Sequence, residues 1–264
     1  MEKMTMRMIT TIDSWKRWRN AIGGEKSVGF VPTMGALHAG HRSLMDRCRQ
    51  ENDICVLSLF VNPTQFNDPK DLEAYPVTID QDRQLCEAAG VDAIFSPQYG
   101  DLYPDDYRYR VSENQWSRLL CGAHRPGHFD GVLSIVMKML NLIRPRRAYF
   151  GEKDWQQLQL VKGMVAAFFM PVAIVGCTTI READGLALSS RNRRLSPDQR
   201  VKAADFPRLL SATDGDNAQI AERLVHAGFA VDYVENFMGR RCAAIHCGGV
   251  RLIDNVPLPE GDAQ

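Results

Sequence analysis

Two histidines, His38 and His41, lie three residues apart in the stretch 28–41, which reads VGFVPTMGALHAGH. The β-branched and aromatic residues at its start predict a buried parallel strand, which Pro32 is expected to stop before a tight turn. A helical pattern follows, beginning at Ser43. Free N–H groups and the helix dipole attract anions at such a junction of strand, turn and helix. The stretch therefore predicts an anion site that carries two imidazoles.

The common phosphate-binding loops do not account for this stretch, because the sequence contains neither GxxxxGK[ST] nor GxGxxG. The letters HAGH instead resemble the HxGH motif of nucleotidyl-transferring α/β enzymes. In those enzymes the histidines stabilise the triphosphate of ATP while its α-phosphorus is attacked. An HxxH pair taken alone is more often structural or a chance metal pair. Other motifs must decide between these interpretations.

The elements that position such a site follow from two apolar runs. Residues 53–61 read DICVLSLFV, which is typical of a central parallel strand covered on both faces. This strand leads into Asn62 and Gln65, where substrates bind in open α/β sheets, although a solvated polar turn would have the same residues. A second strand is predicted at 147–150, with residues 151–154 at its carboxyl end.

The alternation of strands and helices up to residue 195 predicts a doubly wound parallel sheet. Residues 196–264 are expected to form a small C-terminal α+β domain, with weak strands at 231–234 and 243–246. Residues 99–110 are expected to be a loop with a short strand, and 121–129 a polar loop outside the core. The long polar segment 178–192 is expected to be functional, because long loops inside compact domains usually are.

Composition excludes several classes of protein. The 264 residues are 45% hydrophobic and carry 32 basic and 32 acidic side chains, so the formal net charge is zero. A general nucleic-acid binder needs excess positive charge. No apolar run reaches the length of a membrane span, and the first residues lack the apolar core of a signal peptide. Seven cysteines without a CxxC motif predict reduced thiols and a cytoplasmic location.

Five segments occur in a fixed order: PTMGALHAGH, FVNPTQF, GHFDGV, FGEKDWQQL and DGLALSSRN. With these segments the chain resembles the pantoate–β-alanine ligase family over residues 28–200. The resemblance implies a Rossmann-like fold of the HxGH nucleotidyltransferase type and a homodimer. It also implies a reaction in which ATP, pantoate and β-alanine give AMP, pyrophosphate and pantothenate, with Mg²⁺ and through an enzyme-bound pantoyl adenylate.

The resemblance also implies roles for individual residues. His38 and His41 would contact the phosphates, with His41 as proton donor, while Lys153 and Arg191 would add positive charge. Residues 189–191 resemble the mobile lid segment of the family. The implied ATP site comprises Met34, Gly35, Ala36, Leu37, His38, Ala39, Gly40, His41, Gly151, Glu152, Lys153, Asp154, Ile180, Leu188, Ser189, Ser190 and Arg191.

Neutral amides suit the binding of pantoate, because a lysine or arginine paired with its carboxylate would lower the nucleophilicity of that group. By resemblance the amides are those of Gln65 and Gln157. The further residues implied to hold substrates are Asn62, Tyr75 and Arg125. Asp82 would orient waters of Mg²⁺, since a hard cation bound chiefly by phosphates needs few protein ligands.

The chain departs from the family pattern at two places. Val77 stands where the family commonly carries arginine. The joining stretch 236–242 is much shorter than is usual in the family. The small domain is therefore expected to be abbreviated and to cover the site less completely.

Three other readings remain. A nucleotidylyltransferase shares the HxGH motif but needs no second nucleophile site. An aminoacyl-tRNA-synthetase-like protein would be expected to carry more positive charge and an anticodon-binding appendage. A binding module without catalysis would be expected to lose Lys153 or the histidines.

Overall fold

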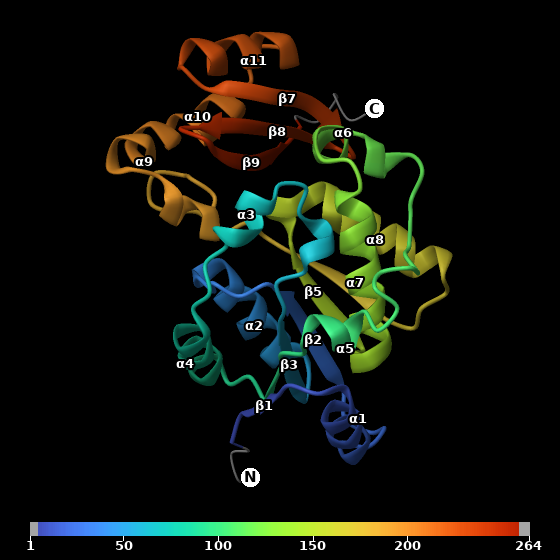
Figure 1. The fold of residues 1–264 in the computed structure, drawn as a ribbon. Coiled ribbons are helices and arrows are strands. Elements are labelled where there is room, and N and C mark those ends of the chain that lie inside the picture. The colour runs from blue at the N-terminus through green and yellow to red at the C-terminus, as the bar shows by residue number, and fades with distance from the viewer. Residues whose placement is uncertain (1–4, 259–264) are drawn as a thin grey trace.

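Two sheets organise the computed structural model, which describes residues 5–258 (Figure 1). The first sheet is parallel and has the order β1-β4-β3-β2-β5-β6. Its strands are β1 (Arg7–Ile9), β2 (Val28–Thr33), β3 (Ile54–Leu59), β4 (Ala93–Phe95), β5 (Arg147–Gly151) and β6 (Ala173–Cys177). The chain winds from β2 to β3 and β4 in one direction and continues through β5 and β6 in the other. This order confirms the predicted doubly wound sheet and places its topological switch point between β2 and β5.

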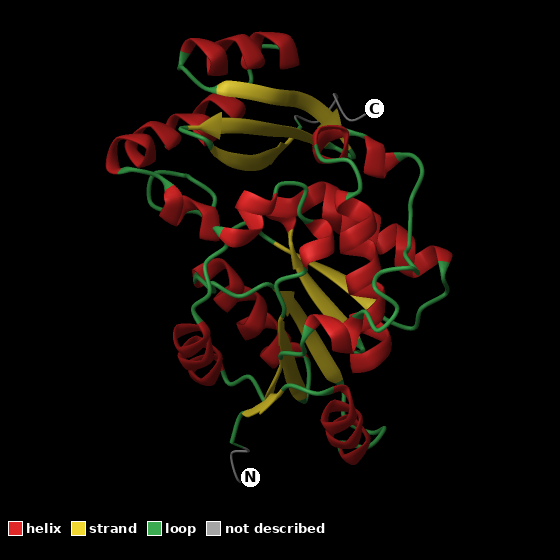
Figure 2. Cartoon of the chain, viewed as in Figure 1, coloured by secondary structure: helices red, strands yellow, loops and turns green. Residues whose placement is uncertain are grey.

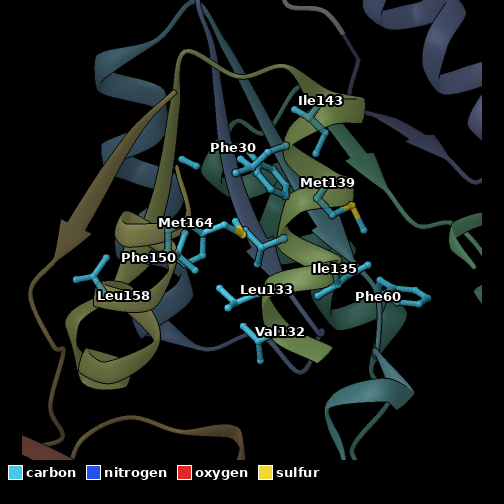
Figure 3. Close-up of a cluster of buried hydrophobic side chains, with 14 of the residues drawn as sticks. Phe30, Phe60, Val132, Leu133, Ile135, Met139, Ile143, Phe150, Leu158 and Met164 are labelled. Carbon is cyan, nitrogen blue, oxygen red and sulfur yellow. The ribbon is translucent and has the colours of Figure 1, made fainter. Parts of the chain in front are cut away.

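Helices cover both faces of the parallel sheet, as Figure 2 shows. One face carries α1 (Ile12–Ala21), α7 (His128–Ile143) and α8 (Trp155–Ala167), and the other carries α2 (Ala39–Glu51) and α4 (Ile79–Ala89). Successive strand residues point to opposite faces, so Phe30 packs with the first layer and Val31 with the second. Figure 3 shows the first layer, where Leu133 of α7 and Phe150 of β5 lie in the same apolar cluster as Phe30.

Short elements connect these layers. They are α3 (Pro69–Glu73), α5 (Tyr99–Leu102), α6 (Leu120–His124) and the single 3₁₀ turns Pro63–Gln65, Trp116–Arg118, Glu152–Asp154 and Ser190–Arg194. The strand expected within 99–110 does not form, because this segment begins with α5 and continues as turns. The segment 121–129 was expected to lie outside the core, yet Cys121 and Phe129 are buried. The Gln156 side chain fixes this segment by accepting the N–H of Cys121 at 3.1 Å.

The first strand and the first helix after it differ from the prediction at their ends. β2 continues through Pro32, which was expected to stop it. β2 pairs with β5 only at Gly29 and Phe30, so the missing N–H of Pro32 costs no ladder hydrogen bond on that side. Helix α2 begins at Ala39, four residues before Ser43, because His38 caps its N-terminus.

The second sheet is antiparallel and contains β7 (Ala230–Phe237), β8 (Arg240–Cys247) and β9 (Val250–Pro257). Helices α9 (Pro197–Ala203), α10 (Asp205–Leu210) and α11 (Asn217–His226) precede it. The expected α+β character is confirmed, but the strands are longer than predicted and β9 was not expected. The short stretch 236–242 forms a hairpin whose turn residues Met238 and Gly239 have φ of 48° and 75°. The domain has its own apolar core, so it is ordered despite its small size.

All seven cysteines are unpaired and buried. Between residues 5 and 258, none of the helices combines the length and the apolar character that crossing a bilayer requires.

Gly131 on α7 tests how closely this helix must approach the turn after β3. A Cβ at Gly131 would lie on the Thr64 carbonyl group and 2.8 Å from the Gln65 amide nitrogen. We therefore expect Gly131→Ala to lower the free energy of unfolding by about 1–3 kcal/mol, the usual cost of overpacking. Gly163→Ala on α8 is the matched control, because its nearest neighbour lies at 4.0 Å; it should gain about 0.5–1 kcal/mol from helix propensity. Urea unfolding measures both, and equal stability of the two variants would contradict the close approach.

Candidate active site

Two neighbouring cavities open at the carboxyl ends of β2, β3 and β5. The inner cavity, of about 250 Å³, lies against the HAGH turn and the segment 178–191. The outer cavity, of about 440 Å³, lies between α3, α6 and the C-terminal sheet. Lining residues common to both include Met34, Gln65, Lys153, Gln157 and Arg191. The site thus lies at the switch point of the sheet, where parallel strands leave a crevice.

The two imidazoles of the HAGH turn are fixed by backbone hydrogen bonds. The Gly40 N–H donates to His38 Nδ1 at 3.1 Å, and the His38 N–H donates to His41 Nδ1 at 3.3 Å. Each neutral ring therefore carries its proton on Nε2. The ring centroids are 4.1 Å apart. At Gly40 a Cβ would lie 2.9 Å from the His38 ring, which explains the glycine between the histidines.

Both histidines are neutral at physiological pH. Burial, with a smaller contribution from the charge of Lys153, lowers the pKa of His38 to about 4. Burial, followed by the proximity of His38, lowers the pKa of His41 to about 3. In the free protein each neutral ring can therefore donate a hydrogen bond from Nε2, and the role of His41 as proton donor stays a prediction.

Asp82 lies beneath the turn that precedes the histidines. Its side chain is 2% exposed, and its two oxygens accept the N–H groups of Ala36 at 2.9 Å and Leu37 at 2.7 Å. The hydroxyl of Thr78 donates to it at 3.1 Å. This differs from the expected role beside Mg²⁺, because the carboxylate lies outside both cavities and its oxygens are already bonded. Asp82 holds the turn in shape.

The amide of Gln65 is oriented by Asn62, which is 1% exposed. Asn62 Nδ2 donates to Gln65 Oε1 and to the Gly131 carbonyl, both at 3.1 Å, while the Tyr103 hydroxyl donates to Asn62 Oδ1 at 3.0 Å. Asn62, which was expected to hold substrate, lines the inner cavity, and its side-chain atoms also bond within the protein. Gln65 and Gln157 are the two glutamines that line this cavity among residues 5–258.

Sequence reasoning did not single out His128, although the segment GHFDGV contains it. His128 Nδ1 donates to the Gln65 carbonyl at 2.8 Å, and Arg125 donates to the same oxygen at 3.1 Å. Arg125 also donates to His128 Nε2 at 3.1 Å. Burial, reinforced by the charge of Arg125, lowers the pKa of His128 to about 3. Burial, followed by the charge of Arg191, lowers the pKa of Arg125 to about 10.

Two arginines of the segment 189–194 bind one carboxylate on α3, that of Asp71. Arg191 donates to one oxygen of Asp71 at 2.9 Å, and Arg194 donates to the other at 2.5 Å. Burial opposes the charge of Asp71, but the two guanidinium groups outweigh it and hold the pKa of this carboxyl below its usual value. The expected lid segment is therefore docked against the first sheet's domain in this structure.

The structure brings most of the sequence-predicted residues together. The inner cavity is lined by Met34, His38, Gly40, His41, Gly151, Lys153, Asp154, Ile180, Leu188, Ser189, Ser190, Arg191, Asn62, Gln65, Tyr75 and Gln157. Arg125 lines only the outer cavity. Of the residues predicted for the ATP site, five lie outside the two linings: Gly35, Ala36, Leu37, Ala39 and Glu152. Val77 is 72% exposed, away from both cavities.

Neutral imidazole donors, a lysine and two glutamine amides surround one crevice at the switch point of a doubly wound sheet. The fold and this crevice define a nucleotide-binding α/β enzyme of the HxGH type. A family model described as pantoate-beta-alanine ligase matches residues 7–257. The chain belongs to this family.

Similar proteins support the same family. The chain is 56% identical to a pantothenate synthetase of Bdellovibrio bacteriovorus over 96% of this chain and 99% of the relative. It is 50% identical to one of Legionella pneumophila over 96% and 100% of the two chains. A Francisella tularensis pantoate-beta-alanine ligase, solved in complex with beta-gamma ATP and beta-alanine, superposes with a TM-score of 0.92 at 38% identity, covering 96% and 98%. The chain is an enzyme, and its reaction is the ATP-dependent ligation of pantoate and β-alanine.

The lowered histidine pKa values give a pH prediction. Nuclear magnetic resonance of the ligand-free protein should show the His38 and His41 ring protons unshifted between pH 8 and 5.5. Because folding lowers these pKa values from 6.5, the unfolded chain takes up protons first, so the free energy of unfolding should fall as the pH drops from 6.5 towards 4. Titration of either active-site ring near pH 6.5 would contradict the buried, neutral assignment.

Proposed function

We propose that the ligation runs through a pantoyl adenylate formed in the inner cavity. A pantoate carboxylate oxygen attacks the α-phosphorus of ATP, the bond to the β-phosphate oxygen breaks, and pyrophosphate leaves. The amine of β-alanine then attacks the acyl carbon, its proton is lost, and AMP departs as pantothenate forms. The observation that carries this proposal is that the amides of Gln65 and Gln157 face the same cavity as His38, His41 and Lys153.

The residues around the phosphates have one electrostatic task. Phosphoryl transfer depends mainly on positioning and on stabilising charge that spreads over the phosphate oxygens. The Nε2–H groups of His38 and His41, the N-terminus of α2 and the ammonium of Lys153 supply donors for that charge. Arg191, Ser189 and Ser190 add donors from the segment 189–194. A neutral imidazole keeps its donor at any pH where the enzyme works.

We propose that pantoate lies against Gln65 and Gln157. Neutral amides hold its carboxylate and hydroxyl oxygens without withdrawing the negative charge that makes the carboxylate a nucleophile. Phe60, Val132 and Val136 form an apolar wall of the same cavity, which suits the methyl groups of pantoate. Asn62 and His128 support this site by holding Gln65 from its side chain and its backbone.

We propose that β-alanine binds in the outer cavity. The Francisella tularensis relative was solved with beta-alanine bound. Here Arg125 lines the outer cavity, and its guanidinium can pair with a carboxylate. The amine would then point towards the shared boundary at Lys153 and Gln157, where the acyl carbon of the adenylate would lie.

We propose Mg²⁺ as the partner of ATP. In the part of the chain described, no group of three or more His, Cys, Asp or Glu side chains forms a cage for a metal. Among residues 5–258, Asp154 is the one carboxylate that lines the inner cavity. Asp82 is buried and does not line this cavity. These residues fit a cation held chiefly by phosphate oxygens, with Asp154 binding one of its waters. Bound there, the ion would neutralise phosphate charge.

Two further proposals concern the state of the enzyme. We propose a homodimer, as the family resemblance implies, which light scattering at several concentrations would test. We propose a cytoplasmic location, which the seven unpaired buried thiols support.

The order of the two half-reactions can be tested directly. Pantoate alone, with Mg²⁺, should support exchange of labelled pyrophosphate into ATP, and AMP should form with pantothenate only when β-alanine is added. Omitting each substrate in turn gives the controls. Exchange that requires β-alanine, or ADP as the product, would contradict an acyl adenylate. A nucleotidylyltransferase would show no amine-dependent turnover.

The division of roles predicts different defects for two variants. Lys153→Ala should lower kcat by about 10²–10³-fold, the usual scale for one contact to developing charge. Gln157→Ala should instead raise the KM for pantoate and leave ATP binding nearly unchanged. Lys162→Ala, an exposed lysine on α8, is the control and should behave as the parent enzyme. Steady-state kinetics in all three substrates measure these effects, and a near-normal kcat for Lys153→Ala would remove this lysine from the catalytic set.

A further inference from the structure

The C-terminal sheet contacts the turn that carries Lys153 through one buried side chain. Asn255 on β9 is 2% exposed. Its Nδ2 donates to two consecutive carbonyl oxygens, those of Glu152 and Lys153, each at 2.9 Å. Both N–H bonds of the amide are therefore used on the backbone of the 3₁₀ turn Glu152–Asp154.

The orientation of this amide is fixed from its other side. Arg240 Nη1 donates to Asn255 Oδ1 at 2.8 Å, and a guanidinium can only donate, so Nδ2 must face the turn. The same guanidinium donates to Glu152 Oε2 at 2.8 Å and lies 4.4 Å from the centre of the Trp155 ring. Arg240 thus contacts Asn255, the first residue of the turn and the first residue of α8.

The neighbouring residue on β9, Asp254, holds another wall of the inner cavity. Asp254, which is 3% exposed, accepts two hydrogen bonds from Arg181, at 2.6 and 2.9 Å. Arg181 belongs to a small hairpin closed by the hydrogen bond from the Leu188 N–H to the Ile180 carbonyl at 3.0 Å. Ile180 and Leu188 both line the inner cavity.

The lysine side chain itself has little to hold it. The Lys153 side chain is 18% exposed, and among residues 5–258 its one carboxylate partner within 4.0 Å is Asp154, at 3.9 Å from Nζ. The place of the ammonium group therefore depends on the backbone of the turn. A displacement of about 1 Å at such a group can cost about 10²-fold in rate.

We propose that Asn255 is a positioning residue for Lys153, and that the C-terminal sheet thereby sets the rate of adenylate formation. The inference rests on the proposed role of Lys153. The sheet was expected to act as a cover, but these contacts give it a second task. Asp254 assists by holding the hairpin with Ile180 and Leu188, on which nucleotide affinity depends. The enzyme consequently assembles its phosphate site from both of its sheets.

The decisive variant is Asn255→Asp, which keeps the shape and replaces two donors by a carboxylate facing two carbonyl oxygens. We expect kcat of pantoate-dependent pyrophosphate exchange to fall by about 10²-fold, while the KM values for ATP and pantoate change less than about threefold. Arg181→Lys, which loses the paired hydrogen bonds to Asp254, should mainly raise the KM for ATP. Asn236→Ala on β7 is the matched control, since this asparagine is exposed and contacts Asn217 on the same domain.

A double-mutant cycle separates positioning from general damage. If Asn255 acts through Lys153, Asn255→Asp should cost less than about threefold in single-turnover rate when Lys153 is already alanine. Equal losses in both backgrounds would overturn the proposal, as would a normal kcat for Asn255→Asp. Asn255→Ser retains one donor and should recover part of the rate, which keeps the test valid if the aspartate variant fails to fold. Failure of the parent enzyme to exchange pyrophosphate would instead refute the adenylate route itself.

Discussion

The reversal of winding direction between β2 and β5 is the constraint on which the rest of the structure depends. Two adjacent parallel strands must send their following segments to opposite faces, so a crevice remains at their carboxyl ends. The HAGH turn follows β2, and the turn with Lys153 follows β5. The two histidines and Lys153, which are more than 100 residues apart in sequence, are thereby brought to one cavity.

Around that crevice the protein separates neutral donors from charged ones. Burial and nearby cations lower the pKa values of the three histidines, so these side chains stay neutral and act as directed hydrogen-bond donors or acceptors. Arg191 and Arg194 share the carboxylate of Asp71, which fixes the direction of both guanidinium groups. These donors are therefore in place in the ligand-free protein and need not be assembled during a reaction.

Local patterns in the sequence made much of the fold predictable, whereas contacts between residues distant in sequence could not be predicted. Apolar runs and turn residues identified β2, β3 and β5, because burial of a parallel strand leaves a direct trace in its sequence. The start of α2 was missed, since its capping box consists of two histidines without apolar periodicity. The continuation of β2 through Pro32 depends on where its neighbour stops pairing. Asp82 bonds to Leu37, 45 residues away, and Asn255 bonds to Lys153, 102 residues away. Residue type alone therefore could not show whether such a side chain binds a ligand or supports a turn.

The carboxylate of Asp82, beneath the turn that precedes the histidines, affects the entropic cost of ligand binding. Gly35 and Ala36 both have positive φ, a conformation that turns consecutive N–H groups towards one point. Asp82 takes the N–H groups of Ala36 and Leu37, as a bound anion does in other loops. The backbone here is already ordered, and ordering one residue costs about 1–2 kcal/mol of conformational entropy. The proposed ATP site therefore rests on a loop whose conformational entropy was lost during folding, so that part of the ordering cost does not fall on ligand binding.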